Sequence, residues 1–146
     1  MGRISASAAL PYPPELVWRV ATRIGDLPRW MPEVVAAELL DPPLSVGSRA
    51  KLRLSPAAAN AEVAATVTAL VAPTRLVMTG AGGPLGVAVH VTLSETAGAG
   101  TEATVEINLD TPPFLGFIAR EVERKLEAGL PAALQKLRAL IEAEPA

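Results

Sequence analysis

Every second residue from Ile4 to Leu10 is apolar, and the residues between them are small or polar. This period of two predicts a strand with one buried face. Apolar residues then recur at helical spacing over residues 14–23, and Gly25 is placed to end that helix. Asp26 can cap one further helical turn, which Pro32 closes. We therefore expect a strand followed by two short helices.

From Val34 the pattern remains strand-like as far as residue 109. Breakers rich in proline and glycine divide this stretch into further strands. We expect these strands at residues 34–41, 47–54, 60–71, 74–80, 86–95 and 101–109. Connections as short as these favour antiparallel neighbours that follow one another as a meander.

A long helical segment follows Pro113 and extends to about Glu144. Its expected apolar stripe consists of Phe114, Ile118, Val122, Leu126, Leu130, Ala133, Leu137 and Leu140. Gly129 and Pro131 interrupt this segment, because glycine weakens a helix and proline removes one of its hydrogen bonds. They predict either a bend that follows a curved sheet or a missing volume that leaves room for a ligand.

These elements predict an α+β fold in which a seven-stranded, curved antiparallel sheet wraps around the long C-terminal helix. That helix is the only element long enough to cover the apolar face of the sheet. The two short helices after the first strand would close one end. A cavity is expected between helix and sheet, because small side chains cannot fill a deeply curved trough around a cylinder. We expect residues 1–146 to form one domain.

The composition narrows the possible chemistry. The chain has no cysteine and one histidine, which excludes disulfides, zinc–thiolate sites and iron–sulfur clusters, so we expect no metal and no cofactor. The net charge is −2 and the sequence has no run of basic residues, which argues against nucleic-acid binding. No apolar stretch reaches the ~20 residues of a membrane span, and the start lacks a secretory pattern, so a cytoplasmic location is expected.

Hydrophobic residues make up 50% of the chain, but aromatic residues only 3%. The interior must therefore be built from alanine, valine and leucine. Such an interior is either tightly packed or hollow.

Several short stretches carry a resemblance that spans essentially the whole chain. They are PPELVW at 13–18, DLPRWMP at 26–32, VGSR at 46–49, APTRL at 72–76 and LRALIE at 137–142. In these stretches the sequence resembles the START-like (SRPBCC) superfamily, in particular its polyketide cyclase/dehydrase and lipid-transport branch. The resemblance implies a helix-grip fold with a hydrophobic pocket for lipids, polyketides, steroids or similar ligands. The motifs specify the fold better than the function.

A pocket between the sheet and the long helix would be lined by residues of both. The expected ligand-binding residues are Trp30, Leu52, Thr66, Met78, Phe114, Ile118, Val122 and Gly129. Enzymes of the superfamily carry aromatic, arginine and serine side chains on the middle strands. Residues 61–69 of this chain contain no Trp, Arg or Ser, which weakens the cyclase interpretation.

For two strands the sequence does not determine which face points toward the helix. His90 shares a face with Thr92 and points outward if the valines beside it point toward the helix, whereas a proton shuttle would need the opposite register. Glu62, Thr66 and Thr68 share a face, which apolar alternation places outside and the family comparison places inside.

Two other features have a structural and a functional interpretation. Trp30 is either a core anchor or a ligand contact. The alternating residues Arg49, Lys51 and Arg53 form a solvated basic ladder, with a head-group site as the minor alternative.

The leading hypothesis is binding or carriage of a hydrophobic small molecule (a lipid, polyketide or isoprenoid-like compound) in the cavity between sheet and C-terminal helix. The alternative is a cofactor-independent cyclase or dehydratase that acts on a polyketide in the same cavity. A third possibility is a structural or regulatory protein that acts through its outer face. In each case we expect a monomer or homodimer, with no nucleic-acid partner and no catalytic residue that the sequence alone can name.

Overall fold

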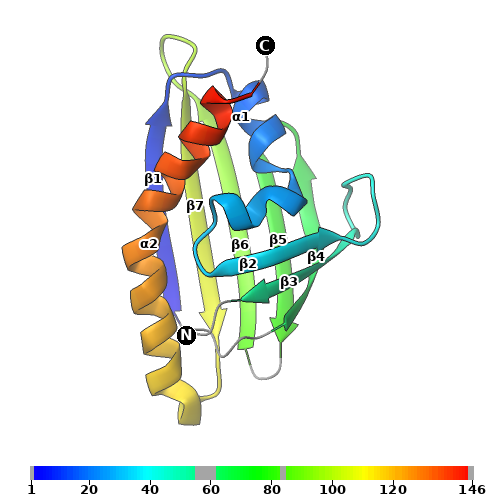
Figure 1. The fold of residues 1–146 in the computed structure, drawn as a ribbon, viewed down its shortest axis with the longest axis vertical. Coiled ribbons are helices and arrows are strands. Elements are labelled where there is room, and N and C mark those ends of the chain that lie inside the picture. The colour runs from blue at the N-terminus through cyan, green and yellow to red at the C-terminus, as the bar shows by residue number, and fades with distance from the viewer. Residues whose placement is uncertain (1, 55–61, 83–84, 145–146) are drawn as a thin grey trace.

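The computed structural model describes residues 2–54, 62–82 and 85–144 (Figure 1). The chain begins with a strand, a helix and a 3₁₀ helix. These are β1 (Gly2–Leu10), α1 (Pro14–Ala21) and η1 (Ile24–Arg29). Six strands follow: β2 (Val34–Leu39), β3 (Arg49–Leu54), β4 (Glu62–Val71), β5 (Arg75–Gly82), β6 (Leu85–Glu95) and β7 (Thr101–Asp110). The chain continues through a short 3₁₀ turn, η3 (Pro113–Leu115), into the long helix α2 (Gly116–Glu142).

The strands form one seven-stranded sheet in the order β1-β7-β6-β5-β4-β3-β2. Each pair of neighbours is antiparallel, so the expected meander and the α+β class are confirmed. β1 joins the far edge by pairing with β7. Figure 1 shows α2 running along the face of the sheet that α1 and η1 also cover, which is the helix-grip arrangement.

The connection from β2 to β3 is longer than the sequence indicates, because β2 ends at Leu39 and β3 begins at Arg49. Side-chain hydrogen bonds order this connection. The buried Ser48 hydroxyl donates to the carbonyl oxygen of Asp41 at 3.1 Å, and the Asp41 carboxylate accepts from the backbone N–H of Arg49 at 2.9 Å. These side-chain hydrogen bonds add to the backbone hydrogen bonds of the connection, such as that from Leu40 N–H to the carbonyl oxygen of Arg49.

The helix α2 continues through Pro131 as one element. Its inward side consists of Val122, Leu126, Leu130, Ala133, Leu134, Leu137 and Ile141, each at most 5% exposed. The expected stripe is wrong at its start, where Phe114 is 76% exposed. Phe114 belongs to η3 and precedes α2, so the helical period does not extend to it.

Polar contacts join the ends of the elements. The hydroxyl of the fully buried Thr101 donates to the carbonyl oxygen of Tyr12 at 2.7 Å, which ties β7 to the segment after β1. Arg23 forms a bidentate ion pair with Glu144, just beyond the end of α2.

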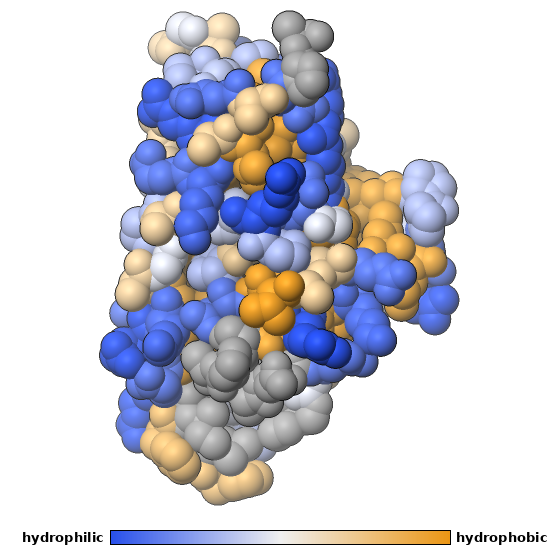
Figure 2. All heavy atoms as spheres, in the orientation of Figure 1, coloured by the Kyte–Doolittle hydropathy of each residue, from blue (hydrophilic) through white to orange (hydrophobic). Residues whose placement is uncertain are grey.

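Figure 2 shows a mainly hydrophilic surface on the side viewed there, with apolar residues exposed in separate groups. No helix in the described part of the chain is long and apolar enough to cross a membrane.

Candidate functional site

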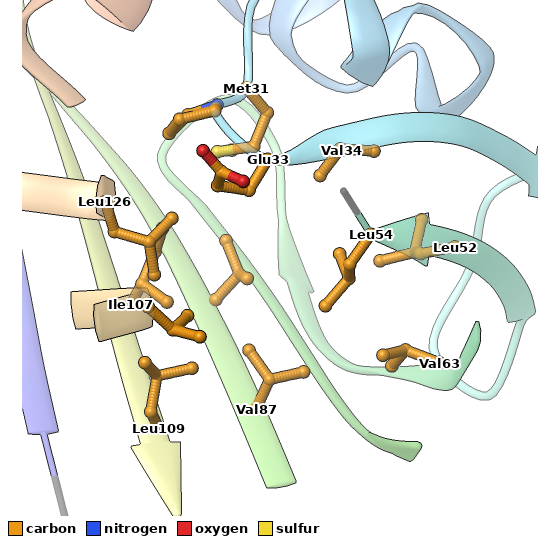
Figure 3. A pocket seen from close by; sticks show the side chains of 13 residues that line it. Met31, Glu33, Val34, Leu52, Leu54, Val63, Val87, Ile107, Leu109 and Leu126 are labelled. Atoms are coloured by element: carbon orange, nitrogen blue, oxygen red, sulfur yellow. The ribbon is translucent and has the colours of Figure 1, made fainter. Parts of the chain in front are cut away.

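An apolar pocket lies between the sheet and α2 (Figure 3). Its volume is about 50 Å³. The sheet and the helix contribute Leu52, Leu54, Val63, Val87, Val89, Ile107, Leu109, Val122 and Leu126. The turn from η1 into β2 closes one side with Met31, Pro32, Glu33 and Val34. Strand alternation explains this lining, because inward-facing residues of β3, β4, β6 and β7 are aliphatic at every second position.

A second apolar pocket of about 30 Å³ adjoins the first toward η1. Four residues line both pockets: Met31, Val34, Leu52 and Val89. The side chains of these residues therefore lie between the two volumes.

Three of the expected ligand-binding residues line these pockets. Leu52 lines both, Val122 lines the larger one and Met78 lines the smaller one. They come from β3, α2 and β5, which are distant in sequence, and the fold brings their side chains to one apolar space.

Other expected residues do not join them. Thr66 lies on the exposed face of β4, because Val63, Ala65 and Val67 point inward. Glu62 and Thr68 share the outer face with Thr66, so apolar alternation decides the open question of this strand.

Phe114 is also absent from the described lining of both pockets. Phe114 is exposed in η3, so its expected place in the pocket is not observed. Ile118 belongs to α2, but its side chain lies outside the described residues.

Gly129 leaves no room for a ligand. A Cβ atom at this position would lie 2.9 Å from Cβ of Pro32. The missing side chain is therefore replaced by the ring of Pro32, and α2 approaches the turn before β2 closely. The expected ligand volume at Gly129 is corrected to a helix–turn contact.

Trp30 is 1% exposed and belongs to the core. It is absent from the lining of both apolar pockets in the described part of the chain. Its indole Nε1 has no hydrogen-bond partner among the described residues. The interpretation as a core anchor fits this placement.

His90 lies on the outer face of the sheet, opposite Glu106 of β7. The pKa of Glu106 is lowered, first by the hydrogen bond from Asn108 and then by the charges of Arg3 and His90. The neighbours Val89 and Val91 line the two pockets, so His90 has no place in them.

The basic residues of β3 are exposed, and two of them form ion pairs. Arg49 contacts Asp41 at 2.8 Å, and Lys51 lies 3.5 Å from Glu62. This arrangement fits a solvated ladder. No group of three or more His, Cys, Asp or Glu side chains within residues 2–54, 62–82 and 85–144 could hold a metal ion.

The sequence pattern missed Glu33, the ionisable residue among the described lining residues of the larger pocket. Glu33 has a φ angle of 65°, a left-handed conformation that is uncommon for residues other than glycine. Only the adjacent proline signals a turn here, and it does not indicate the direction of the side chain.

Comparisons with known proteins agree with this architecture. Residues 1–142 match the family described as polyketide cyclase / dehydrase and lipid transport. A comparison with curated proteins found no significant match.

Among solved structures, TTHA0849 from Thermus thermophilus is similar, with a TM-score of 0.80 and 16% identity, covering 99% of this chain and 100% of that one. The Zhui aromatase/cyclase from Streptomyces sp. R1128 has a TM-score of 0.78 and 12% identity, covering 97% of this chain and 93% of that one. Ara h 8.0201 has a TM-score of 0.66 and 16% identity, covering 98% of this chain and 99% of that one.

At these identities the solved structures establish the fold alone. The family match extends over every strand of the sheet and the whole of α2. The chain therefore belongs to the polyketide cyclase / dehydrase and lipid-transport family, whose members point to hydrophobic-ligand binding or cyclase-type activity.

Proposed function

We propose that the protein binds an apolar small molecule (a lipid, polyketide or isoprenoid-like compound) between the sheet and α2. The observation that carries this proposal is the lining of the larger pocket, where every described residue except Glu33 has a hydrocarbon or thioether side chain. Apolar walls with few polar groups are typical of small-molecule sites. Membership of the family supports the same conclusion.

A ligand of this class needs more room than the two pockets provide. Their volumes of about 50 and 30 Å³ fall below the roughly 300–1,000 Å³ of typical ligand sites. Met31 lies between them, and an unbranched thioether side chain changes rotamer readily. Rotation of Met31 would join the two volumes, so we expect binding to be coupled to repacking around this residue.

The cyclase alternative has less support. Acid–base chemistry on a polyketide needs positioned ionisable groups that converge on the reacting atoms. Glu33 is the only ionisable side chain in the described lining of the larger pocket, and the smaller pocket has none in its described lining. A site with one carboxylate favours binding over catalysis.

Thermal unfolding in the presence of dodecan-1-ol tests the proposal. A ligand that binds only the folded state stabilises it by about 2.7 kcal/mol at a free concentration about 100 times Kd. We expect the melting temperature to rise with alcohol concentration and then to follow this logarithmic dependence.

Two variants of α2 locate the site. Val122→Phe places a ring in the larger pocket and should weaken binding, whereas Ala132→Phe adds the same ring at an exposed position and should not. Equal binding by both variants would place the site elsewhere. The absence of any shift with the unmodified protein would contradict the proposed function.

A further inference from the structure

Both phenylalanines of the chain lie at the surface, where β7 leads into α2. Phe114 of η3 is 76% exposed, and Phe117 in the first turn of α2 is 69% exposed. Aromatic residues make up only 3% of the chain, so an excess of aromatic side chains in the core does not explain this exposure. Large apolar side chains exposed close together mark interaction surfaces. Phe114 and Phe117 are called the phenylalanine pair below.

The phenylalanine pair lies at one end of the molecule. Figure 1 shows α2 beginning at the lower end of the ribbon, and Figure 2 shows apolar residues exposed at that end. Leu109 of β7 and Val122 of α2 both line the larger apolar pocket, and the pair lies on the segment that connects them. A surface that bound the pair would therefore lie near this part of the pocket.

Basic side chains follow the pair along α2. Phe117, Arg120 and Arg124 are exposed and share one side of the helix, because they are three and four residues apart. Glu121 is ion-paired with Arg124. Arg120 and Lys125 are exposed too, and neither forms an ion pair with a residue of the described ranges. These two cations can therefore meet an anionic surface without losing an ion pair of the fold.

Two acidic residues near the pair limit this positive charge. The side chain of Glu123 occupies the space beside Gly2 of β1, where a Cβ atom would collide with it, so Glu123 is directed toward the edge of the sheet. Asp110 is exposed at the end of β7 and offsets one positive charge. The positive excess is small, and the aromatic side chains must supply most of the affinity.

The size of the pair favours a lipid surface over a second protein. Two aromatic side chains bury at most about 500 Å² together. One partner in a stable protein interface buries roughly 800 Å². A bilayer interface needs no such area, because a few aromatic side chains inserted at the level of the headgroups, with lysine and arginine beside them, are enough to hold a protein there.

We propose that the phenylalanine pair docks the protein on an anionic lipid bilayer. The two rings insert among the headgroups, and Arg120 and Lys125 face the lipid phosphates beside them. This interaction goes beyond the binding of an apolar ligand, because it uses the outside of the protein. It would also place the pocket next to the phase in which apolar ligands dissolve.

Co-sedimentation with lipid vesicles tests the docking. One set of vesicles contains phosphatidylcholine alone, and the other contains an equimolar mixture with phosphatidylglycerol. We expect tighter binding to the anionic vesicles, and this binding should weaken as salt is added, because salt screens exposed charges.

Two double variants test the aromatic contribution. Replacement of the pair by Phe114→Ala and Phe117→Ala should weaken binding to the anionic vesicles about tenfold or more. The control combines Val46→Ala and Val71→Ala, which remove two other exposed apolar side chains and should leave binding unchanged. Both double variants should keep the melting temperature of the unmodified protein, because all four side chains are exposed.

Single variants test the charge contribution. Arg120→Gln and Lys125→Gln should each weaken binding to the anionic vesicles about fivefold and should leave binding to the neutral vesicles unchanged. Arg53→Gln removes an exposed charge from the outer face of β3 and is the matched control, which should bind as the unmodified protein does.

The docking proposal is overturned if the unmodified protein does not sediment with the anionic vesicles, or if the phenylalanine double variant sediments as well as the valine double variant. Analytical ultracentrifugation without vesicles detects the other occupant, a second copy of the chain. A dimer that the phenylalanine double variant dissociates would also overturn the proposal. The melting shift with dodecan-1-ol is measured without vesicles, so failure of the pocket function and failure of the docking are observed separately.

Discussion

Asp41 shows how one side chain can hold a connection that the hydrophobic pattern does not specify. Its carboxylate accepts hydrogen bonds from the backbone N–H of Arg49 and from the guanidinium at 2.8 and 3.1 Å. The side-chain hydrogen bond from Arg49 is the main reason that the pKa of Asp41 is lowered from 3.8 to about 2. Both groups are largely exposed, so the pair acts on the loop geometry more than on global stability.

Asp41 should contribute to the acid dependence of stability. Because its folded-state pKa is lower than its ordinary value, its contribution is present above pH 3.8 and is lost as the pH falls through about 2. Asp41→Asn removes the carboxylate, so the difference in urea midpoint between the two proteins should shrink across this window. A difference that stays constant from pH 4 to pH 2 would contradict the assignment.

At the scale of elements, strand alternation was the most reliable signal. It placed Val63 and Val67 inward on β4 and left Thr66 outside, although the family resemblance favoured the opposite face. The reason is physical, since a one-residue slip would exchange the buried and exposed faces of the entire strand. Helical periodicity predicted the buried positions Val122, Leu126, Leu130, Ala133 and Leu137 of α2. It failed at Phe114, which lies in η3 before the helix.

The contact between α2 and the turn before β2 is a second feature of this scale. Alanine favours a helix over glycine by about 1 kcal/mol. The Cβ atom of an alanine at position 129 would lie 2.9 Å from Cβ of the rigid Pro32 ring. Overpacking of this kind typically lowers the free energy of unfolding by about 1–3 kcal/mol. We therefore expect Gly129→Ala to lower the free energy of unfolding by up to about 2 kcal/mol, measured by urea denaturation.

Gly116 provides the matched control for this substitution. It begins the same helix, and nothing lies within 4 Å of a Cβ built there. Gly116→Ala should therefore be neutral or stabilising. If Gly129→Ala were as stable as Gly116→Ala, the proposed close contact would be wrong.

At the scale of the whole molecule, the low aromatic content defines the interior. Trp30 is the only aromatic residue of the described chain that is less than 2% exposed, and the sheet side of the pocket is built from valine, leucine and isoleucine. Within the part of the chain that the structure describes, these side chains line two small apolar volumes of about 50 and 30 Å³. Met31 lines both of these described volumes.

Met31→Ala should join the two volumes. We expect the substitution to lower the free energy of unfolding by about 2–5 kcal/mol, because it removes a buried side chain and leaves a cavity. It should also tighten binding of dodecan-1-ol relative to the unmodified protein, since less repacking is then needed. Calorimetry at matched temperature measures the second effect, and weaker binding would contradict the role assigned to Met31.

The sequence by itself determined the order of the elements and the antiparallel meander, because these follow from local period and from breakers between segments, but it left the inward faces of β4 and β6 open. It also identified Leu52, Met78 and Val122 as inward-facing residues near one apolar space. Only the tertiary structure decided that Pro32 fills the space at Gly129 and that Glu33 faces the pocket. Both depend on how closely α2 approaches a turn about one hundred residues earlier in the sequence. Hydrophobic periodicity reports local structure and does not indicate such a long-range contact.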